Sequence, residues 1–329
     1  MMVNCFAHDH RRASPLVGHR KPQLSAHERA GIDAHLGFLK YLHVGAQVAR
    51  TWSPGVGKKD WAGWTSINWR SDLWSYGFNL LDIGKHFNAE MGFVPRKDIR
   101  RGSVWLNYKP RPKIERIRQL FFSSSLVYLT DHRNLLQTRE GELSVRVDME
   151  GGTSINVWAG RQFERLDFDW EIRTGALIPE GLYRWNHGGL SVRLDRSRNL
   201  SGRVSWSRGG YFSGNRTGVS LQGHLRLFHR MLFETIYGYN RLVFPTRSFS
   251  TNTLSERISY SLSPDLFAKV FAQWNDDRKE INLNFLIWYI YMPGSDFYLV
   301  YNERWGIGGG SAEVKDRTIL GKITRLWNL

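Results

Sequence analysis

Apolar and polar residues alternate along most of the chain after about Gly31. Successive side chains of a β-strand point to opposite faces, so a period of two gives each strand one apolar and one polar face. Amphipathic helices of any length are not visible. The clearest alternating stretches are residues 143–150, 190–195, 200–207 and 219–227.

Turn-forming residues interrupt these stretches at regular intervals. Gly, Asn, Asp and Pro supply the backbone conformations that β-hairpins need. The spacing leaves strands of about 9–11 residues, the length that crosses a bilayer at a tilt. The expected turns lie at residues 150–152, 195–199, 263–265, 275–277 and 293–296.

The composition separates these strands from helical membrane proteins and from disordered chains. The 329 residues have a mean hydropathy of −0.42, and the longest apolar run, residues 285–292, is far too short for a membrane helix. The 14 Trp, 13 Tyr and 18 Phe are more aromatic residues than disordered chains carry. With Cys5 as the single cysteine, the chain can form neither an internal disulfide nor a multi-cysteine zinc site.

Two architectures fit this pattern: a transmembrane barrel, whose strands are apolar on one face only, and a soluble sandwich or propeller. The length of the strands and their arrangement as successive hairpins favour the barrel. We therefore expect an all-β protein, an antiparallel up-and-down transmembrane β-barrel of about 14–18 strands over residues 31–329.

Aromatic residues near the expected strand ends also favour a membrane barrel, because Trp and Tyr gather at both water interfaces of such proteins. The alternative is that these residues fill a soluble core. The candidates for membrane-interface residues are Trp158, Trp206, Trp274, Tyr289, Tyr291, Tyr301 and Trp327.

The two ends of the chain differ in character. Residues 1–30 are basic and lack the apolar core of about 7–15 residues that a secretory signal requires. We expect a disordered or artificial lead-in that replaces a longer upstream region, which would leave the barrel incomplete at its N-terminal end. The last strand carries Ile319, Ile323, Trp327 and Leu329 on one face, with Arg325 among them. Such a strand is typical of chains that the barrel-insertion machinery recognises.

Three segments resemble a family of uncharacterised bacterial outer-membrane proteins. They are residues 87–100, 293–303 and 320–327. Intact members carry a signal peptide and an N-terminal module similar to carbohydrate-binding family nine before a long β-barrel; this chain has neither. The resemblance implies a location in the bacterial outer membrane and a barrel architecture. It implies no ligand.

Arginine recurs on the polar faces that would line the barrel lumen. Arginine keeps its charge and presents several donors in a fixed fork, so an arginine-lined lumen favours anions or hydroxyl-rich solutes. The alternative for Arg146 is an ion pair with Asp148 that only stiffens the wall. The lumen candidates are Arg146, Arg193, Arg203, Arg226 and Gln222.

Residues 93–98 break the alternation. Proline is excluded from central strand pairing, so Pro95 predicts a loop or an inward fold between strands. As a constriction, this segment would present Arg96 and Asp98 to a solute. As an ordinary hairpin loop, it would have no such role.

The chain carries none of the short motifs of hydrolases, nucleotide-binding proteins or zinc proteases, so we predict no catalytic residue, metal site or cofactor. The favoured function is a pore or uptake channel for anionic or carbohydrate-like solutes, with outer-membrane lipid and the insertion machinery as partners. One alternative is a membrane-embedded hydrolase, using pairs such as His224 with Ser220 or His187 with Asp195. The other is a soluble basic protein that binds nucleic acid, prompted by the net charge of +16. The spread of arginines over nearly every strand argues against this last class.

Overall fold

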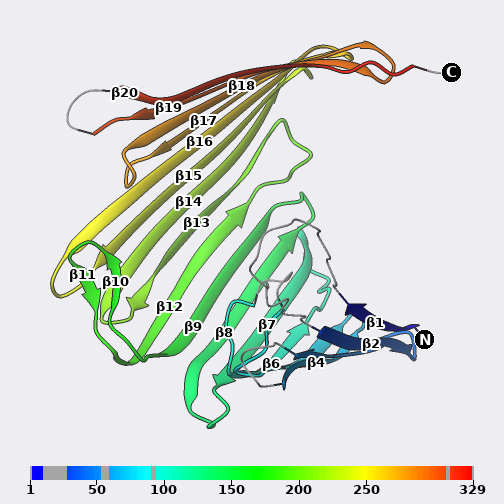
Figure 1. Ribbon diagram of the computed structural model, residues 1–329, viewed down its shortest axis with the longest axis vertical. Helices are drawn as coiled ribbons and strands as arrows, with labels where there is room; N and C mark the ends of the chain where they lie inside the picture. Colours follow the sequence, from blue (N-terminus) through cyan, green and yellow to red (C-terminus); the bar gives the residue numbers. More distant parts are fainter. Residues whose placement is uncertain (1, 10–27, 53–58, 90–93, 309–311, 328–329) are drawn as a thin grey trace, which may run out of the picture.

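The computed structural model describes residues 2–9, 28–52, 59–89, 94–308 and 312–327 (Figure 1). Over this part of the chain the regular structure is entirely β, and no helix could span a membrane. The strands are β1 (Met2–Asp9), β2 (Glu28–Phe38), β3 (Leu42–Trp52), β4 (Lys59–Arg70), β5 (Trp74–Ile83), β6 (Ile99–Tyr108), β7 (Ile117–Thr130), β8 (Leu136–Met149), β9 (Ser154–Leu166), β10 (Trp170–Arg173), β11 (Ala176–Ile178), β12 (Gly181–Arg193), β13 (Leu200–Tyr211), β14 (Gly214–Leu227), β15 (Met231–Val243), β16 (Ser248–Ser263), β17 (Leu266–Asn275), β18 (Glu280–Met292), β19 (Ser295–Gly306) and β20 (Glu313–Ile323).

Eighteen of these strands form one antiparallel sheet in which each strand pairs with its neighbours in the chain. The exception is β9, which pairs with β12, because β10 and β11 form a separate hairpin. The expected all-β class and up-and-down order are confirmed, and the five expected turns all fall between or at the ends of strands. At one of them Gly294 has a φ of 76°, a conformation that glycine adopts without strain.

The sheet curls into an open trough (Figure 1). Within the described residues β1 pairs only with β2 and β20 pairs only with β19, so the two edge strands do not meet. Every residue of β20 is exposed. The sheet has the connectivity expected of a barrel, while the closure of a barrel is not seen.

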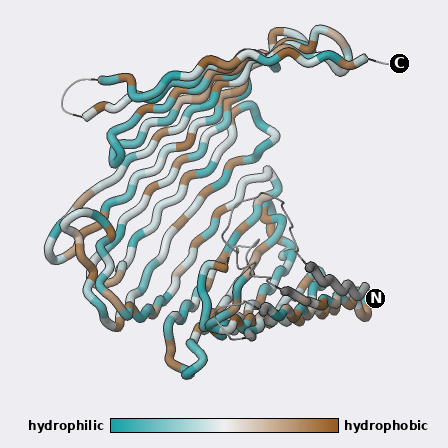
Figure 2. Tube along the Cα trace, viewed as in Figure 1, coloured by the Kyte–Doolittle hydropathy of each residue, from teal (hydrophilic) through white to brown (hydrophobic). Residues whose placement is uncertain are grey.

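The convex face of the trough is apolar. In β13, for example, Val204 is 53% exposed and Trp206 47% exposed. The strand register joins such side chains into rows that cross many strands, and hydropathy alternates along each strand (Figure 2). One row runs from β7 to β20 through Leu120, Val147, Ile155, Val192, Val204, Leu221, Tyr237, Leu254, Trp274, Ile281, Trp305 and Val314.

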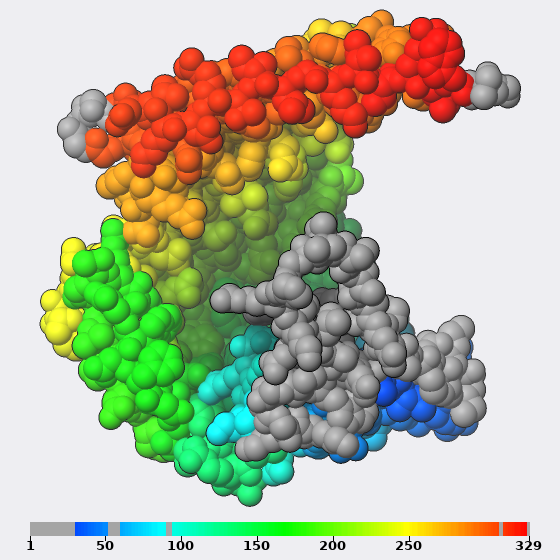
Figure 3. Space-filling view, in the orientation of Figure 1, coloured from blue at the N-terminus to red at the C-terminus, as the bar shows by residue number. Residues whose placement is uncertain are grey.

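The concave face is polar and more sheltered than the convex face. Ser66, Ser75, Ser191 and Ser201 on this face are each at most 7% exposed. The space-filling view looks into this hollow, between the edge formed by β20 and the opposite end of the sheet (Figure 3). The polar half of the alternation therefore lines a trough.

Two long connections fold back over the concave face at the same rim. The hairpin β10–β11 buries Ile178 completely against Leu242 and Phe244. The other connection lies between β5 and β6 and is described at residues 84–89 and 94–98; in it Phe87 is buried against Ile83 and Ile99. The opposite rim carries mostly short turns, such as those at residues 264–265 and 293–294.

Part of the expected N-terminal lead-in lies in the sheet. Met2–Asp9 forms β1, which pairs with β2 from Met2 opposite His35 to Asp9 opposite Glu28. Residues 10–27 lie outside the described residues, as does Leu329 at the other end of the chain.

Candidate functional site

Three of the predicted lumen residues lie side by side on the concave face. Arg193 of β12 is directly opposite Arg203 of β13, and Arg203 is directly opposite Gln222 of β14. Together with Arg196 and His224 they line a cavity of about 110 Å³. We call these five residues the arginine cluster.

The positive charge of the arginine cluster is not neutralised locally. In the described part of the chain, no carboxylate lies within 4.0 Å of the guanidinium of Arg193, Arg196 or Arg203; Arg203 Nη2 instead donates to Ser191 Oγ at 3.2 Å. Glu234 lies 3.7 Å from His224 Nδ1. Like charges directly opposite on adjacent strands are destabilising. An anion would relieve this repulsion through charge-assisted hydrogen bonds.

The other two predicted lumen arginines have different surroundings. Arg146 Nε lies 3.1 Å from Asp148 Oδ1, and its guanidinium sits 3.8 Å from the ring centroid of Phe121. The wall-stiffening ion pair considered from the sequence is thus present. Arg226 is exposed opposite Leu232 on the same concave face, one row beyond His224.

A second basic groove of about 510 Å³ lies nearer the N-terminus. It brings Arg146 together with Arg70 and Lys109, beside the rings of Trp105 and Phe121. Lys109 Nζ donates to Ser71 O at 2.8 Å and to Ser75 Oγ at 2.7 Å. The sequence pattern missed Arg70 and Lys109 because they sit at strand ends, where alternation no longer tells one face from the other.

Side-chain contacts fix the predicted constriction segment at the rim that carries the two long connections. Arg96 Nη2 donates to Gln137 Oε1 at 2.9 Å, and Asp98 Oδ1 lies 2.7 Å from His132 Nδ1. Pro95 lies in the same connection, whose earlier part folds over the concave face. The segment is therefore an inward-folded loop with fixed polar contacts.

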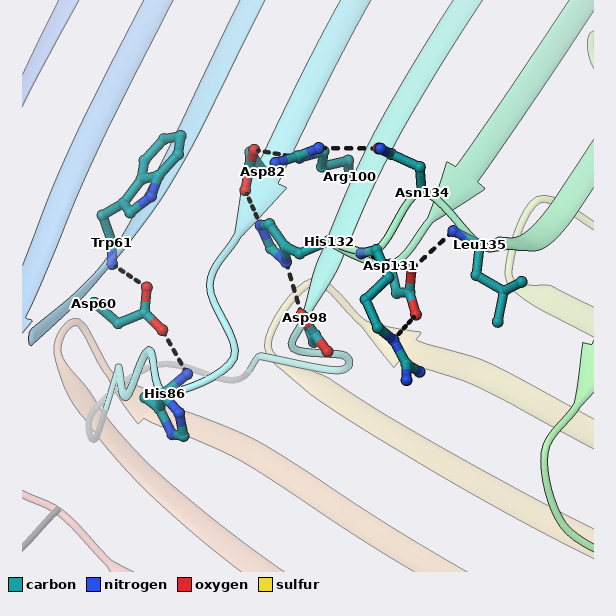
Figure 4. A network of polar contacts seen from close by, with 11 residues as sticks. Asp60, Trp61, Asp82, His86, Asp98, Arg100, Asp131, His132, Asn134 and Leu135 are labelled. Carbon is teal, nitrogen blue, oxygen red and sulfur yellow. Dashed lines mark hydrogen bonds and ion pairs between the residues drawn. The ribbon is translucent and has the colours of Figure 1, made fainter. Parts of the chain in front are cut away.

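His132 is the centre of this polar network (Figure 4). Its Nε2 lies 2.7 Å from Asp82 Oδ1, and Asp82 Oδ2 also accepts a hydrogen bond from Arg100 Nε at 3.3 Å. Burial lowers the pKa of His132, but the hydrogen bonds to Asp82 and Asp98 outweigh it and leave the pKa above its usual value. Both ring nitrogens are occupied, so the imidazole acts as a clamp and is not available as a base.

Two backbone contacts hold the beginning of the same loop. Asp60 Oδ2 accepts a hydrogen bond from the His86 backbone N–H at 2.6 Å, and Thr51 Oγ1 accepts one from Asn88 N–H at 3.3 Å. Thr51 is only 4% exposed. The loop is thus anchored to β3, β4, β5 and the β7–β8 turn.

The seven interface candidates fall into different places. Trp274, Tyr289 and Tyr291 lie in the last four residues of β17 or β18, and Trp327 lies beyond the end of β20. Trp206 and Tyr301 lie in the middle of β13 and β19 on the convex face. Trp158 lies on the concave face, where its ring covers Gly189: a Cβ on that glycine would be 2.3 Å from the indole. It therefore does not belong to the convex rows.

The residue pairs proposed for a hydrolase do not converge. His187 lies within β12, while Asp195 is in the turn that follows it. His224 and Ser220 are four residues apart on β14, about 13 Å along a strand. Among the described residues no group of three or more His, Cys, Asp or Glu side chains is arranged to hold a metal ion. The carboxylates of Asp98 and Asp82 contact opposite ring nitrogens of His132, so these three side chains do not converge on one point.

No protein-family model matches the chain, and no curated protein matches it. The resemblance to the outer-membrane family stays a prediction.

Proposed function

We propose that the chain is the barrel domain of a bacterial outer-membrane protein that binds and passes anionic solutes along its concave face. The single observation that carries the anion preference is the pair Arg193 and Arg203, opposed across two strands with no carboxylate within 4.0 Å in the described residues. Cationic side chains that line a pore set its preference for anions.

The convex face supports the membrane location. This face carries continuous apolar rows, whereas serines and arginines lie on the concave face. This is the reverse of the pattern of a soluble protein, and it matches the apolar outer surface of transmembrane barrels. The arrangement also separates a rim with long connections from a rim of mostly short turns, as in outer-membrane barrels. Outer-membrane lipid would cover the convex rows.

We further propose that the sheet closes in the membrane through its edge strands. An open edge in hydrocarbon leaves backbone N–H and C=O groups without partners, at a cost of several kcal/mol for each group. The sheet has 18 strands, an even number, so β1 and β20 would meet antiparallel. β20, with Ile319 and Ile323 68% and 72% exposed, would also be the strand presented to the insertion machinery.

Conductance tests the proposed function. We expect the full chain, refolded into planar bilayers, to give discrete current steps with a reversal potential displaced towards anions in a salt gradient. Replacing both Arg193 and Arg203 by Gln should move that potential towards zero. The control is Arg208→Gln, which removes one positive charge from the convex face of β13 and should leave the reversal potential unchanged. An unchanged reversal potential in the double variant, or no current, would overturn the proposal.

Closure has its own test, because Cys5 of β1 is the only cysteine of the chain. Single cysteines placed in turn at Lys315, Arg317, Ile319 and Gly321 of β20 should form a cross-link with Cys5 in lipid vesicles at one or two adjacent positions. Val204→Cys, in the middle of the sheet, is the control. Absence of any cross-link along β20 would contradict closure.

A further inference from the structure

A groove of about 580 Å³ on the concave face of β2 to β6 is unlike the arginine cluster in chemistry. It is lined by two indoles, two imidazoles, two carboxamides and one guanidinium. Trp105 and Arg70 also line the second basic groove, so the two are continuous. The side chains concerned are Trp64, Trp105, His35, His43, Asn68, Asn79 and Arg70.

Glycines fix the two indoles against the sheet. A Cβ on Gly45 would lie 2.9 Å from the ring of Trp64, and a Cβ on Gly77 would lie 2.8 Å from Trp105 Nε1. Each ring therefore occupies the space that a side chain would take on the neighbouring strand. The rings are held near the wall of the trough, and the hollow in front of them stays open.

The polar side chains around the indoles are free to bind a ligand. In the described structure, Asn68, His43 and Arg70 make no side-chain hydrogen bond or ion pair with another residue. Asn79 has only a long contact, 3.5 Å from Nδ2 to Ser103 Oγ. Binding sites combine an apolar or aromatic surface with a few placed polar groups of this kind.

We propose that this groove binds an acidic oligosaccharide, a chain of pyranose rings that carries carboxylate groups. The faces of Trp64 and Trp105 suit the C–H faces of sugar rings, and Asn68, Asn79 and His43 suit neighbouring hydroxyls. Arg70, unpaired and exposed, would take the carboxylate, with Lys109 beside it in the continuous second groove. This inference names a class of solute for the proposed function. It rests on the proposed function only for the path that the solute takes through the protein, because binding to the groove does not require a pore.

The test is isothermal titration calorimetry on the full chain refolded in detergent, with trigalacturonic acid and maltotriose as probes. We expect trigalacturonic acid to bind with a dissociation constant of about 1 mM or lower, and maltotriose to bind more weakly. Trp105→Ala should weaken the binding of both probes roughly tenfold. Arg70→Gln should weaken only the binding of trigalacturonic acid.

A control variant and the exposure of Arg70 separate loss of binding from loss of folding. Trp158→Ala removes an indole from the same face outside the groove and should leave both affinities unchanged. Arg70 is exposed at the end of β4, so Arg70→Gln does not threaten folding. Absence of binding to trigalacturonic acid, or equal affinity in wild type, Trp105→Ala and Arg70→Gln, would overturn the proposal. Binding without any conductance would uphold this site and contradict the proposed pore.

Discussion

His132 Nε2 lies 2.7 Å from Asp82 Oδ1, which ties the turn after β7 to the end of β5. On its other side the same ring holds Asp98, at the end of the inward-folded loop. The clamp therefore joins the long connection between β5 and β6 to the rim of the sheet through one titratable group. Arg100, which also bonds Asp82, opposes protonation of the ring.

The clamp predicts that the described parts of this loop, residues 84–89 and 94–98, are held more firmly in acid than in alkali. Because the pKa of His132 is raised on folding, its contribution is complete below the pKa of histidine in the unfolded chain, about 6.5, and is lost as the pH rises through the higher folded-state pKa. Limited proteolysis between pH 5 and 9 should show faster cleavage of the loop at high pH.

His132→Gln should abolish this pH dependence and leave the loop cleaved at the fast rate throughout. His35→Gln, at a histidine whose side chain is 64% exposed, is the control and should keep the wild-type profile. A His132→Gln profile that follows the wild type would contradict the clamp.

The arginine cluster predicts that stability depends on a bound anion. Arg203→Gln removes the repulsion from Arg193 and should raise the free energy of unfolding by about 0.5 kcal/mol at low salt. Sulfate should stabilise the wild type more than chloride at equal ionic strength, and this difference should shrink in the variant. Thermal unfolding in detergent measures both effects. An equal sulfate effect in the two proteins would mean that the cluster binds no anion.

Neighbouring residues of β13 test which face meets lipid. Val204 is on the convex face and 53% exposed, and Ser205 is on the concave face. Val204→Arg should destabilise the membrane-inserted protein by about 2–4 kcal/mol, the cost of a cation near the middle of a bilayer on the lipid side. Ser205→Arg should be tolerated in the trough. Equilibrium refolding into phospholipid vesicles gives both values, and equal effects would place neither face in lipid.

The hairpin β10–β11 depends on one buried side chain. Ile178 is fully buried among Leu242, Phe244 and their neighbours, so Ile178→Ala should cost about 2–5 kcal/mol and release the hairpin from the concave face. Leu177→Ala, one residue earlier and 48% exposed, is the matched control and should cost far less. Protease sensitivity of residues 167–180 reports the release. Equal protease sensitivity of the two variants would contradict the dependence of the hairpin on Ile178.

The alternation of residues was enough to predict an all-β chain, the turns that separate its hairpins and the two faces of each strand. Residues such as Val204 and Arg203 could be assigned to opposite faces because a strand has a period of two, which needs no knowledge of its neighbours. The same rule placed Arg193 and Arg203 on one face.

Only the tertiary structure decided which residues of different strands meet, because register and curl depend on pairing between segments far apart in the chain. It set Arg193 opposite Arg203, placed Trp158 over Gly189 on the concave face, and brought His132 between Asp82 and Asp98. It also left β1 and β20 apart, where the alternation had predicted a barrel that could be incomplete at its N-terminal end. A period of two fixes the face of each side chain, whereas closure depends on the curvature of the whole sheet.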